Sequence, residues 1–290
     1  MKTKVVSALF SLLALIFSAV NAFGDDLPEI KKRGVLRHLG VPYANFVTGS
    51  GDGFSVELIQ GFAEHLGVKY EFVQTSWPTV IQDLSGKMVR PMGDDVDILG
   101  NAPIKGDIIA TGLTVLTWRK KIIDFSTPTF PTQMWLLARA DSSLQPIKST
   151  GDAAKDIKMV KAMLKGRSVL GVADTCLDPH LYGIEKSGGN VMFFQGKLNE
   201  LSPAVIKGEA ETCIYEVPDA LNALKRWPGK LKVIGPLSGK QAMGCGFRKS
   251  CPELRTAFNQ YLEQSRRDGT YLHLVDKYYE DVVVYFPGFF

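Results

Sequence analysis

The sequence predicts an α/β protein with mainly parallel sheets. Short apolar runs typical of strands alternate with amphipathic segments typical of helices along the chain. With 290 residues, it is long enough for one large or two medium domains. It is 45% apolar and 22% charged, which is the composition of a globular protein, and it shows no internal repeat or low-complexity tract.

Charge and hydropathy exclude two other classes of protein. The mean hydropathy of +0.02 is too low for a polytopic membrane protein. The formal net charge is +4, from 34 basic and 30 acidic residues that form no basic tract. The chain therefore lacks the electrostatic footprint of a nucleic-acid-binding protein.

Residues 1–22 have the layout of a secretory signal peptide. Lys2 and Lys4 precede an apolar run from Val5 to Val20, and Ala22 ends the segment at a position suited to cleavage. The alternative is an uncleaved membrane anchor, because the run approaches the length needed to span a bilayer. The segment contains no Cys, so no lipid-modified cysteine is expected there. We expect export to the periplasm.

The first part of the mature chain predicts a strand, helix, strand and helix in succession. A strand at 34–41 is bounded by glycines, and glycine-rich residues 49–53 form a turn. The following helix is capped by Ser55, carries its apolar residues on one face and ends at Gly67. A strand at 68–73 alternates in polarity, and Ser76 and Pro78 begin a short helix. Residues 88–106, rich in Pro, Gly and Asp, are expected to form an irregular inserted loop.

The remaining elements follow from the same patterns. Strands are expected at 107–110, 134–137, 168–172, 191–194, 211–215 and 231–234. Helices are expected at 160–164, 178–187, 218–226, 252–267 and 271–279. Between them lie a polar stretch, 141–156, and a cluster of glycines with one proline, 235–246.

The sequence shows no signature of a metal site, a bound cofactor or a known catalytic motif. The four histidines are scattered and lack the spacing of a helical metal pair. No C-x-x-C motif is present among the four cysteines, which are Cys176, Cys213, Cys245 and Cys251. In an oxidising compartment these four allow three pairings, and their spacing does not choose among them.

The segment from Asp107 to Pro128 contains the residues most suited to binding. Thr111, Gly112 and Thr114 lie at the carboxyl end of an expected strand, where open α/β sheets bind ligands. Arg119 follows, and its planar guanidinium suits a carboxylate. The alternative is an ordinary turn followed by a solvated arginine.

This segment resembles the signature of bacterial periplasmic solute-binding proteins of family 3, the polar amino-acid-binding type. The Thr111-to-Arg119 stretch and the Asp124-to-Pro128 stretch match its two halves. Further elements of the family follow in the same order along nearly the whole mature chain. They are Gly34–Arg37, Tyr43–Phe46, Gly53–Leu58, Gly208–Pro218 and Arg267–Tyr271.

The resemblance implies a two-lobed periplasmic binding protein of type II-like fold, with a ligand cleft between two α/β lobes. Lobe 1 would comprise 25–131 plus 243–290, and lobe 2 would comprise 132–242. The two hinge crossings would fall at 129–132 and within 235–242. Closure about such hinges buries a ligand between the lobes.

The resemblance also assigns ligand-binding roles by position. Arg119 would bind an α-carboxylate, helped by Thr114 and the backbone at Gly112. An α-ammonium would be held by Thr111 from lobe 1 and by Glu216 from lobe 2.

Aromatic and second-lobe positions complete the implied site. Tyr43 and Trp77 would sandwich the ligand side chain, or else would serve only to pack the lobe. Thr175 represents the family's carboxylate-binding turn in lobe 2, beside the atypical Asp174. In lobe 2 the family has Asp where this chain has Glu216.

Disulfides within each lobe would leave the hinge free, so the implied pairs are Cys176–Cys213 and Cys245–Cys251. The role implied for the chain is that of a monomer that captures a small polar solute, such as an amino acid, and delivers it to an ABC permease in the inner membrane. Gly40 stands where members that bind basic amino acids often carry an acid, which disfavours a basic ligand.

Two other functions remain open at this point. One is an exported enzyme similar to cyclohexadienyl dehydratase, with Glu216, Asp178 or His180 as its general acid. The other is an accessory or sensory binding module.

Overall fold

A computed structural model describes residues 26–173, 175–196 and 200–290 of the chain. The predicted signal peptide (1–22) and Asp174 lie outside these residues. Within the described part, no helix combines the length and the apolar character needed to cross a membrane.

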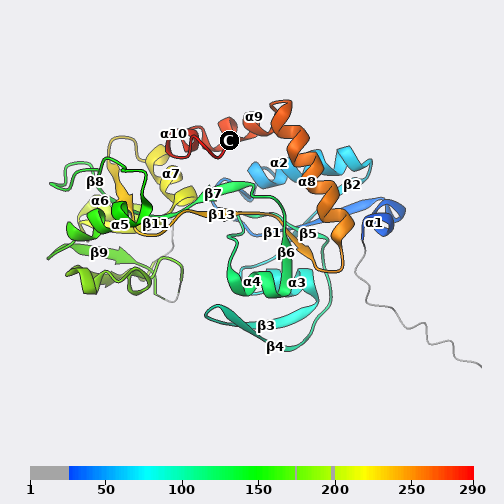
Figure 1. The fold of residues 1–290 in the computed structure, drawn as a ribbon, viewed down its shortest axis with the longest axis horizontal. Coiled ribbons are helices and arrows are strands. Elements are labelled where there is room, and N and C mark those ends of the chain that lie inside the picture. The colour runs from blue at the N-terminus through cyan, green and yellow to red at the C-terminus, as the bar shows by residue number, and fades with distance from the viewer. Residues whose placement is uncertain (1–25, 174, 197–199) are drawn as a thin grey trace, which may run out of the picture.

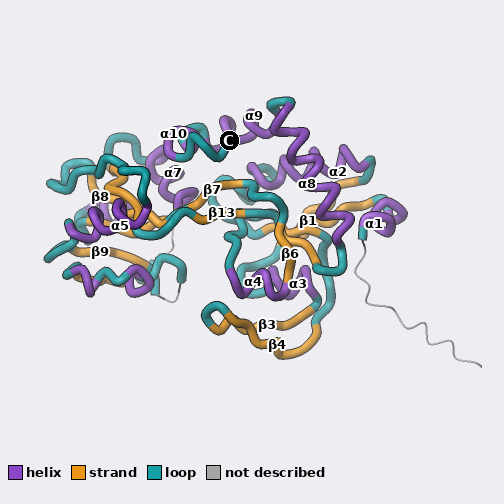
Figure 2. Tube along the Cα trace, viewed as in Figure 1, coloured by secondary structure: helices purple, strands orange, loops and turns teal. Residues whose placement is uncertain are grey.

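The architecture consists of two five-stranded sheets, each with helices packed against it (Figures 1 and 2). The strands of the first sheet, in spatial order, are β2 (Lys69–Gln74), β1 (Val35–Gly40), β5 (Ile108–Ile109), β14 (Gly246–Arg248) and β6 (Ile123–Phe125). Those of the second are β10 (Asn190–Phe193), β9 (Ser168–Gly171), β11 (Thr212–Glu216), β8 (Met134–Arg139) and β12 (Leu231–Pro236). All strands of the first sheet lie within residues 35–125 and 246–248, and all strands of the second sheet lie within residues 134–236.

Two short strands connect the sheets. β7 (Phe130–Thr132) pairs with β13 (Gln241–Met243) in an antiparallel ribbon at the centre of the molecule (Figure 1). The chain therefore passes between the two sheets twice, once through β7 and once through β13.

The sheets are mixed, so the prediction of mainly parallel sheets was wrong. β1 pairs in parallel with β2 and β5, and β9 with β10 and β11. β14 and β8 each run antiparallel to both of their neighbours. These two strands follow the connecting ribbon directly, without a crossover helix, and this lets them enter their sheets in the opposite direction.

Helices of the first unit cover both faces of its sheet. On one side lie α2 (Phe54–Leu66), α8 (Pro252–Arg267) and α9 (Thr270–Tyr279), and on the other α3 (Val80–Ser85) and α4 (Thr117–Ile122) (Figure 1). Helix α1 (Leu27–Arg33) precedes β1. In α2 the buried residues recur at helical spacing, and Gly67 ends the helix with a left-handed φ of 71°.

The second unit has its own helices. α5 (Ala153–Ala162) packs on β12, α6 (Leu201–Lys207) on β11, β8 and β9, and α7 (Val217–Arg226) on β11, β8 and β12. α5 begins earlier than expected because Asp152 caps it, accepting from the backbone of Ala154 and Lys155. The expected helix at 178–187 is instead two 3-10 turns, Pro179–Tyr182 and Glu185–Ser187, each followed by a glycine with positive φ.

Residues 88–106 contain a β-hairpin, so the prediction of an irregular loop was wrong. β3 (Lys87–Met92) pairs antiparallel with β4 (Asp95–Asn101). Val89 and Val96 pack against the core formed by α3, α4 and β1. This partial burial supplies a hydrophobic face that an isolated hairpin would lack.

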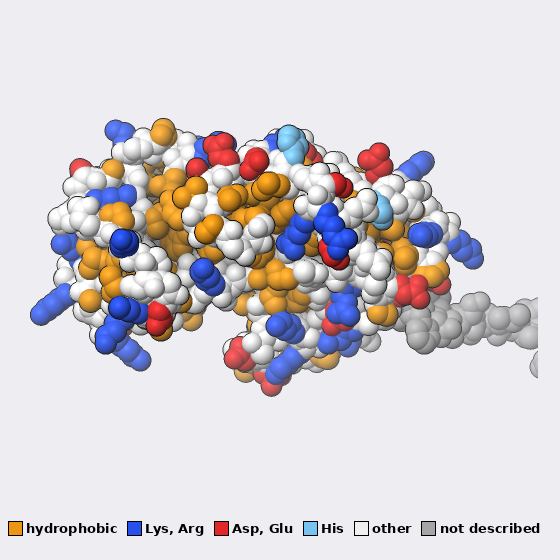
Figure 3. Space-filling view, turned by 45° about the horizontal axis from the view of Figure 1, so that its top comes forward, with side chains coloured by type: hydrophobic (Ala, Val, Ile, Leu, Met, Phe, Trp, Pro, Cys, Tyr) orange, Lys and Arg blue, Asp and Glu red, His pale blue; other side chains and the backbone are white. Residues whose placement is uncertain are grey.

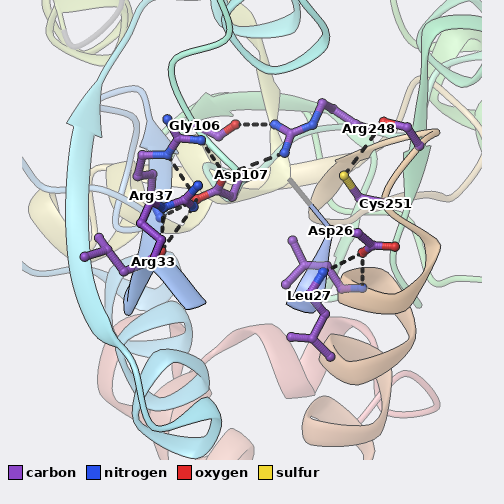
Figure 4. Close-up of polar contacts among 11 residues, drawn as sticks. Asp26, Leu27, Arg33, Arg37, Gly106, Asp107, Arg248 and Cys251 are labelled. Atoms are coloured by element: carbon purple, nitrogen blue, oxygen red, sulfur yellow. Dashed lines mark hydrogen bonds and ion pairs between the residues drawn. The ribbon is translucent and has the colours of Figure 1, made fainter. Parts of the chain in front are cut away.

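A buried carboxylate joins the ends of several segments of the first unit. Asp107, just before β5, is fully buried and lies 2.6 Å from Arg33, 2.7 Å from Arg37 and 3.6 Å from Arg248 (Figure 4). Burial alone would raise the pKa of Asp107, but the hydrogen bonds and charges of Arg37 and Arg33 outweigh it and hold the pKa below its usual value. The cluster ties α1, β1 and β14 to β5.

The C-terminal residues contact both units. After α9, helix α10 (Val282–Tyr285) brings Tyr285 and Phe286 against Trp135 of β8, with ring centroids 4.7 and 6.0 Å apart. Phe290 returns to Phe130 of the connecting ribbon. On the face seen in Figure 3, apolar side chains form a band along the middle of the molecule.

All four cysteines are free thiols in the structure. Cys176 is exposed, whereas Cys213, Cys245 and Cys251 are buried. The implied pairs Cys176–Cys213 and Cys245–Cys251 are therefore not formed in this structure.

Candidate functional site

The predicted binding residues of the two units meet beside the connecting ribbon. Glu216, the last residue of β11, is buried, and its carboxylate accepts three hydrogen bonds. Tyr43 donates to Oε2 at 2.9 Å, while Thr114 and Thr132 both donate to Oε1 at 3.0 Å. Tyr43 and Thr114 belong to the first unit, so Glu216 joins the two units.

Burial and hydrogen bonding act on Glu216 in opposite directions. Burial raises the pKa of the carboxyl group above its usual value, although the three hydroxyl donors and the charge of Arg119 oppose the rise. A positively charged ligand nitrogen beside Glu216 would compensate for the water that the carboxylate loses on burial, and it would favour the ionised form of the carboxyl group.

Arg119 lies in α4, one turn beyond Thr114, and its guanidinium is largely turned away from solvent. Nη1 donates to the Thr114 carbonyl at 2.8 Å, and the group lies 5.4 Å from the ring of Trp118. Nε is buried, and within the described residues it has no hydrogen-bond partner. Burial lowers the pKa of Arg119 to about 10, which still leaves it cationic at neutral pH.

An orphaned buried donor of this kind is unusual, because most buried polar atoms are paired. Within the described residues, the charge of Glu216 acts on Arg119, but the buried Nε has no acceptor. A carboxylate is the group that a guanidinium edge binds best. The arrangement therefore offers a place for an anionic oxygen.

Gly112 is required by the packing of the strand end. Its φ is +67°, and a Cβ atom there would lie 2.4 Å from the ring of Phe46. Only glycine fits this left-handed position against a buried aromatic ring. The backbone at Gly112 can therefore pass close to the site.

Thr111 is placed behind the site. Its hydroxyl donates to the Val41 carbonyl at 2.6 Å and accepts from the Val41 amide at 3.1 Å. The side chain is fully buried and joins the ends of β5 and β1. In this arrangement the hydroxyl of Thr111 supports the site without facing it.

Thr175 is also kept from the site. It is exposed, donates to the Val172 carbonyl at 2.8 Å and accepts from the Leu177 amide at 3.0 Å. These bonds form a local turn after β9, and they do not bring Thr175 to Glu216 or Arg119.

Tyr43 and Trp77 contact each other directly. Their rings meet edge to face with centroids 5.5 Å apart, and Trp77 is 41% exposed. A ligand side chain placed between the two rings would have to separate them.

Two residues that the sequence did not single out complete the cluster. Thr132, in the connecting ribbon, donates to Glu216. Asp219, in the first turn of α7, lies 3.0 Å from the Tyr43 hydroxyl and shares its one proton with Glu216. Burial, followed by the charge of Glu216, raises the pKa of Asp219 to about 7. Asp219 could have been predicted from the sequence, because it lies three positions after Glu216 at the start of an expected helix and so falls on the same face.

His180 and Asp178, considered above as possible general acids, lie in an exposed 3-10 turn. His180 contacts Asp178 at 3.0 Å and Glu185 at 3.4 Å. Of the three candidate acids, Glu216 is the one that is buried. Among the described residues, no three His, Cys, Asp or Glu side chains group closely enough to hold a metal ion.

The two-sheet fold, with polar residues of both units meeting beside the connecting ribbon, is that of a solute-binding protein. The family model of bacterial extracellular solute-binding proteins, family 3, matches residues 40–90 and 102–281. The chain belongs to this family. The unmatched residues 91–101 lie in the β3–β4 hairpin.

Two individual relatives are a binding protein and a longer protein of a different name. The chain is 25% identical over 286 residues to the L-cystine-binding protein TcyJ of Escherichia coli strain K12, covering 94% of each. It is 25% identical over 234 residues to the membrane-bound lytic murein transglycosylase F of Desulfosudis oleivorans; that match covers 79% of this chain and spans 44% of the relative's length.

A solved structure shows the same two-lobed fold. It is that of the ancestral amino acid-binding protein AncCDT-1, a precursor of cyclohexadienyl dehydratase, with a TM-score of 0.62 and 25% identity. The match covers 87% of this chain and 98% of that chain.

Proposed function

We propose that the protein is a periplasmic binding protein for a small amino-acid-like solute, which it delivers to an ABC transporter. It would be exported by the signal peptide at 1–22. The lobes would comprise 25–131 plus 243–290 and 132–242, with the β7–β13 ribbon as the hinge. Membership of the family and the two-lobed fold support this proposal.

The observation that carries the proposal is the opposed pair formed by Arg119 and Glu216. In the part of the chain that the structure describes, Nε of Arg119 is a buried donor without a hydrogen-bond partner, and Glu216 holds a buried carboxylate on the other lobe. An α-amino acid carries the two complementary charges on adjacent groups. Its carboxylate would bind Arg119 and its ammonium Glu216, with Thr114 and the Gly112 backbone as neighbours.

Lobe contacts in the structure indicate how binding would proceed. Tyr43 and Thr114, from lobe 1, donate hydrogen bonds to Glu216 of lobe 2, so these bonds hold the two lobes together at the site. A ligand must replace these bonds, and it would favour closure only through contacts that are better than the ones it displaces.

The first experiment is a thermal-shift screen of the mature protein against amino acids, including L-cystine, followed by calorimetry on each hit. A ligand at about 100 times its Kd should add roughly 2.7 kcal/mol to the free energy of unfolding. In Arg119→Ala the same ligand should bind about 2–5 kcal/mol more weakly. Equal affinity in Arg119→Ala would refute the assignment of the carboxylate contact.

A dehydratase-like enzyme is a second candidate, favoured by one observation. Asp219 lies beside Tyr43, 3.0 Å from its hydroxyl, and burial raises the pKa of this carboxyl group to about 7, where a general acid works best at neutral pH. Incubation of the purified protein with prephenate or arogenate tests this directly. Product formation that is lost in Asp219→Asn would support the enzyme, and its absence at high protein concentration would exclude this activity.

A further inference from the structure

Where the two units touch, two carboxyl groups of the second unit face a single hydroxyl of the first. The Tyr43 hydroxyl lies 2.9 Å from Oε2 of Glu216 and 3.0 Å from Oδ2 of Asp219. A hydroxyl has one proton, so Tyr43 donates to only one of the two carboxyl groups at a time. The other carboxyl oxygen then faces the hydroxyl oxygen with no hydrogen between them.

Glu216 is the better placed of the two acids to stay ionised. Its carboxylate also accepts hydrogen bonds from Thr114 and Thr132, and the charge of Arg119 favours the ionised form. Hydrogen bonds donated to a carboxylate stabilise its charged form. We therefore expect the Tyr43 proton to lie toward Glu216.

Asp219 has no comparable set of donors. Among the described residues, Tyr43 is the one hydrogen-bond donor that reaches its side chain. Burial, followed by the charge of Glu216, raises the pKa of Asp219 to about 7. A protonated Asp219 is itself a donor and can bond to the Tyr43 oxygen while Tyr43 donates to Glu216. Each of the two oxygen–oxygen gaps in this row then contains a hydrogen.

Water can supply and remove the proton of Asp219. A cavity of about 640 Å³ lies between the loop 42–45 of the first unit and the part of α7 that carries Asp219. Asp219 is half-buried and lines this cavity. Its carboxyl group can therefore exchange a proton with solvent without unfolding of either unit.

The other titratable groups that act on this cluster keep their charge near neutral pH. Burial raises the pKa of the tyrosines and of the thiol among them above their usual values, so they stay protonated. The lysine and the arginines are cationic in this range. These groups are Tyr43 after β1, Tyr215 of β11, Cys176 after β9, Tyr279 of α9, Arg119 of α4, and Lys225 and Arg226 of α7.

We propose that Asp219 controls the contact between the two units: when protonated it completes the row with Tyr43 and Glu216 and holds the units together, and when ionised it lets them separate. The proton is taken up from water as the units join and returns to water as they part. Because the joined arrangement raises the pKa of Asp219, its contribution is present at low pH and is lost as pH rises through about 7. This inference goes beyond the proposed function, because it concerns the protein without a solute.

Two measurements on the mature protein without solute test the inference. Small-angle X-ray scattering at about pH 5.5 and about pH 8.5 follows the separation of the units, and we expect the ratio of separated to joined molecules to rise about tenfold or more. A carbon-13 NMR titration follows the carboxyl group of Asp219 directly, and we expect its midpoint near pH 7.

Two variants should act in opposite directions. Asp219→Asn has an amide that can donate to the Tyr43 oxygen at every pH, so the units should stay joined at both pH values. Tyr43→Phe removes the shared hydroxyl, so fewer molecules should be joined at either pH. If Asp219 served only the fold, Asp219→Asn would loosen the contact as Tyr43→Phe does. Asp276→Asn, at an exposed residue of α9, is the control and should keep the pH response of the unmutated protein.

Several results would overturn the inference. A midpoint near the ordinary value of an aspartate would show that Asp219 is ionised in the joined arrangement. A midpoint near pH 7 with an unchanged radius of gyration would show that the proton moves without the units. Urea unfolding checks that both variants fold, and if Tyr43→Phe does not, the comparison of Asp219→Asn with Asp276→Asn decides. The thermal-shift screen is independent of these results: if no amino acid binds there, the proposed function fails and this inference stands.

Discussion

Replacing Glu216 by glutamine preserves the shape of the side chain and removes its negative charge. In the structure, Thr114 and Thr132 donate to one carboxylate oxygen and Tyr43 donates to the other. The glutamine carbonyl can keep the two threonine bonds, and its amide can donate to the Tyr43 oxygen. The packing of the empty protein should therefore survive the substitution.

The expected effects on binding and on stability differ in size. A ligand ammonium at Glu216 would lose a buried, charge-assisted partner, which costs about 2–5 kcal/mol and raises Kd from roughly 30-fold to several thousand-fold. The free energy of unfolding without ligand should change by no more than about 1 kcal/mol. Burial raises the pKa of Glu216, so the neutral side chain also avoids the cost of a desolvated charge.

Calorimetry with the identified ligand and urea unfolding without it measure the two effects. Glu209→Gln is the matched control, because Glu209 is exposed and lies in the loop before β11. Unchanged ligand affinity in Glu216→Gln would refute the role of Glu216. A loss of several kcal/mol in the stability of the empty protein would show that the carboxylate serves the fold instead.

Three further predictions concern stability and the thiols. Burial lowers the pKa of His38 to about 4, so as pH falls the unfolded chain takes up a proton at this residue before the folded protein does. The free energy of unfolding should therefore drop by about 3 kcal/mol between pH 6.5 and pH 4. An NMR titration that placed the pKa of His38 near 6.5 would contradict the argument. Asp107→Asn should lower the free energy of unfolding by about 3–5 kcal/mol, measured with urea, because Arg33 and Arg37 lose their buried partner. As a control, Asp97→Asn removes an exposed ion pair and should lower it by about 1 kcal/mol or less. Ellman titration of the unfolded, unreduced protein should count four thiols, and a count of two or none would show that disulfides form.

Elements with a strong local pattern were predictable from the sequence. The predicted bounds of α8 match the structure, and those of α9 differ by one residue. Gly67 ends α2 as expected, but the helix begins at Phe54 after Gly53, so the prediction that Ser55 caps it was wrong. These features depend on residues a few positions apart, which the sequence places side by side. The β3–β4 hairpin was missed because its strands are mostly exposed and carry Pro91 and several charges, so little alternation in polarity marks them.

The sequence by itself determined the family, the two-part α/β architecture and the identity of Arg119, Thr114 and Glu216 as candidates, since each lies within a short motif. Only the tertiary structure decided which side chains meet. It brought Tyr43 to Glu216 and Asp219, which are more than 170 positions away in the sequence. It also bonded Thr111 to Val41 and held Thr175 in a local turn, so neither hydroxyl reaches the site. Such contacts depend on how the two sheets are connected and packed. The periodicity of one segment shows which of its own residues share a face, but it does not show which residues of another segment will pack against that face.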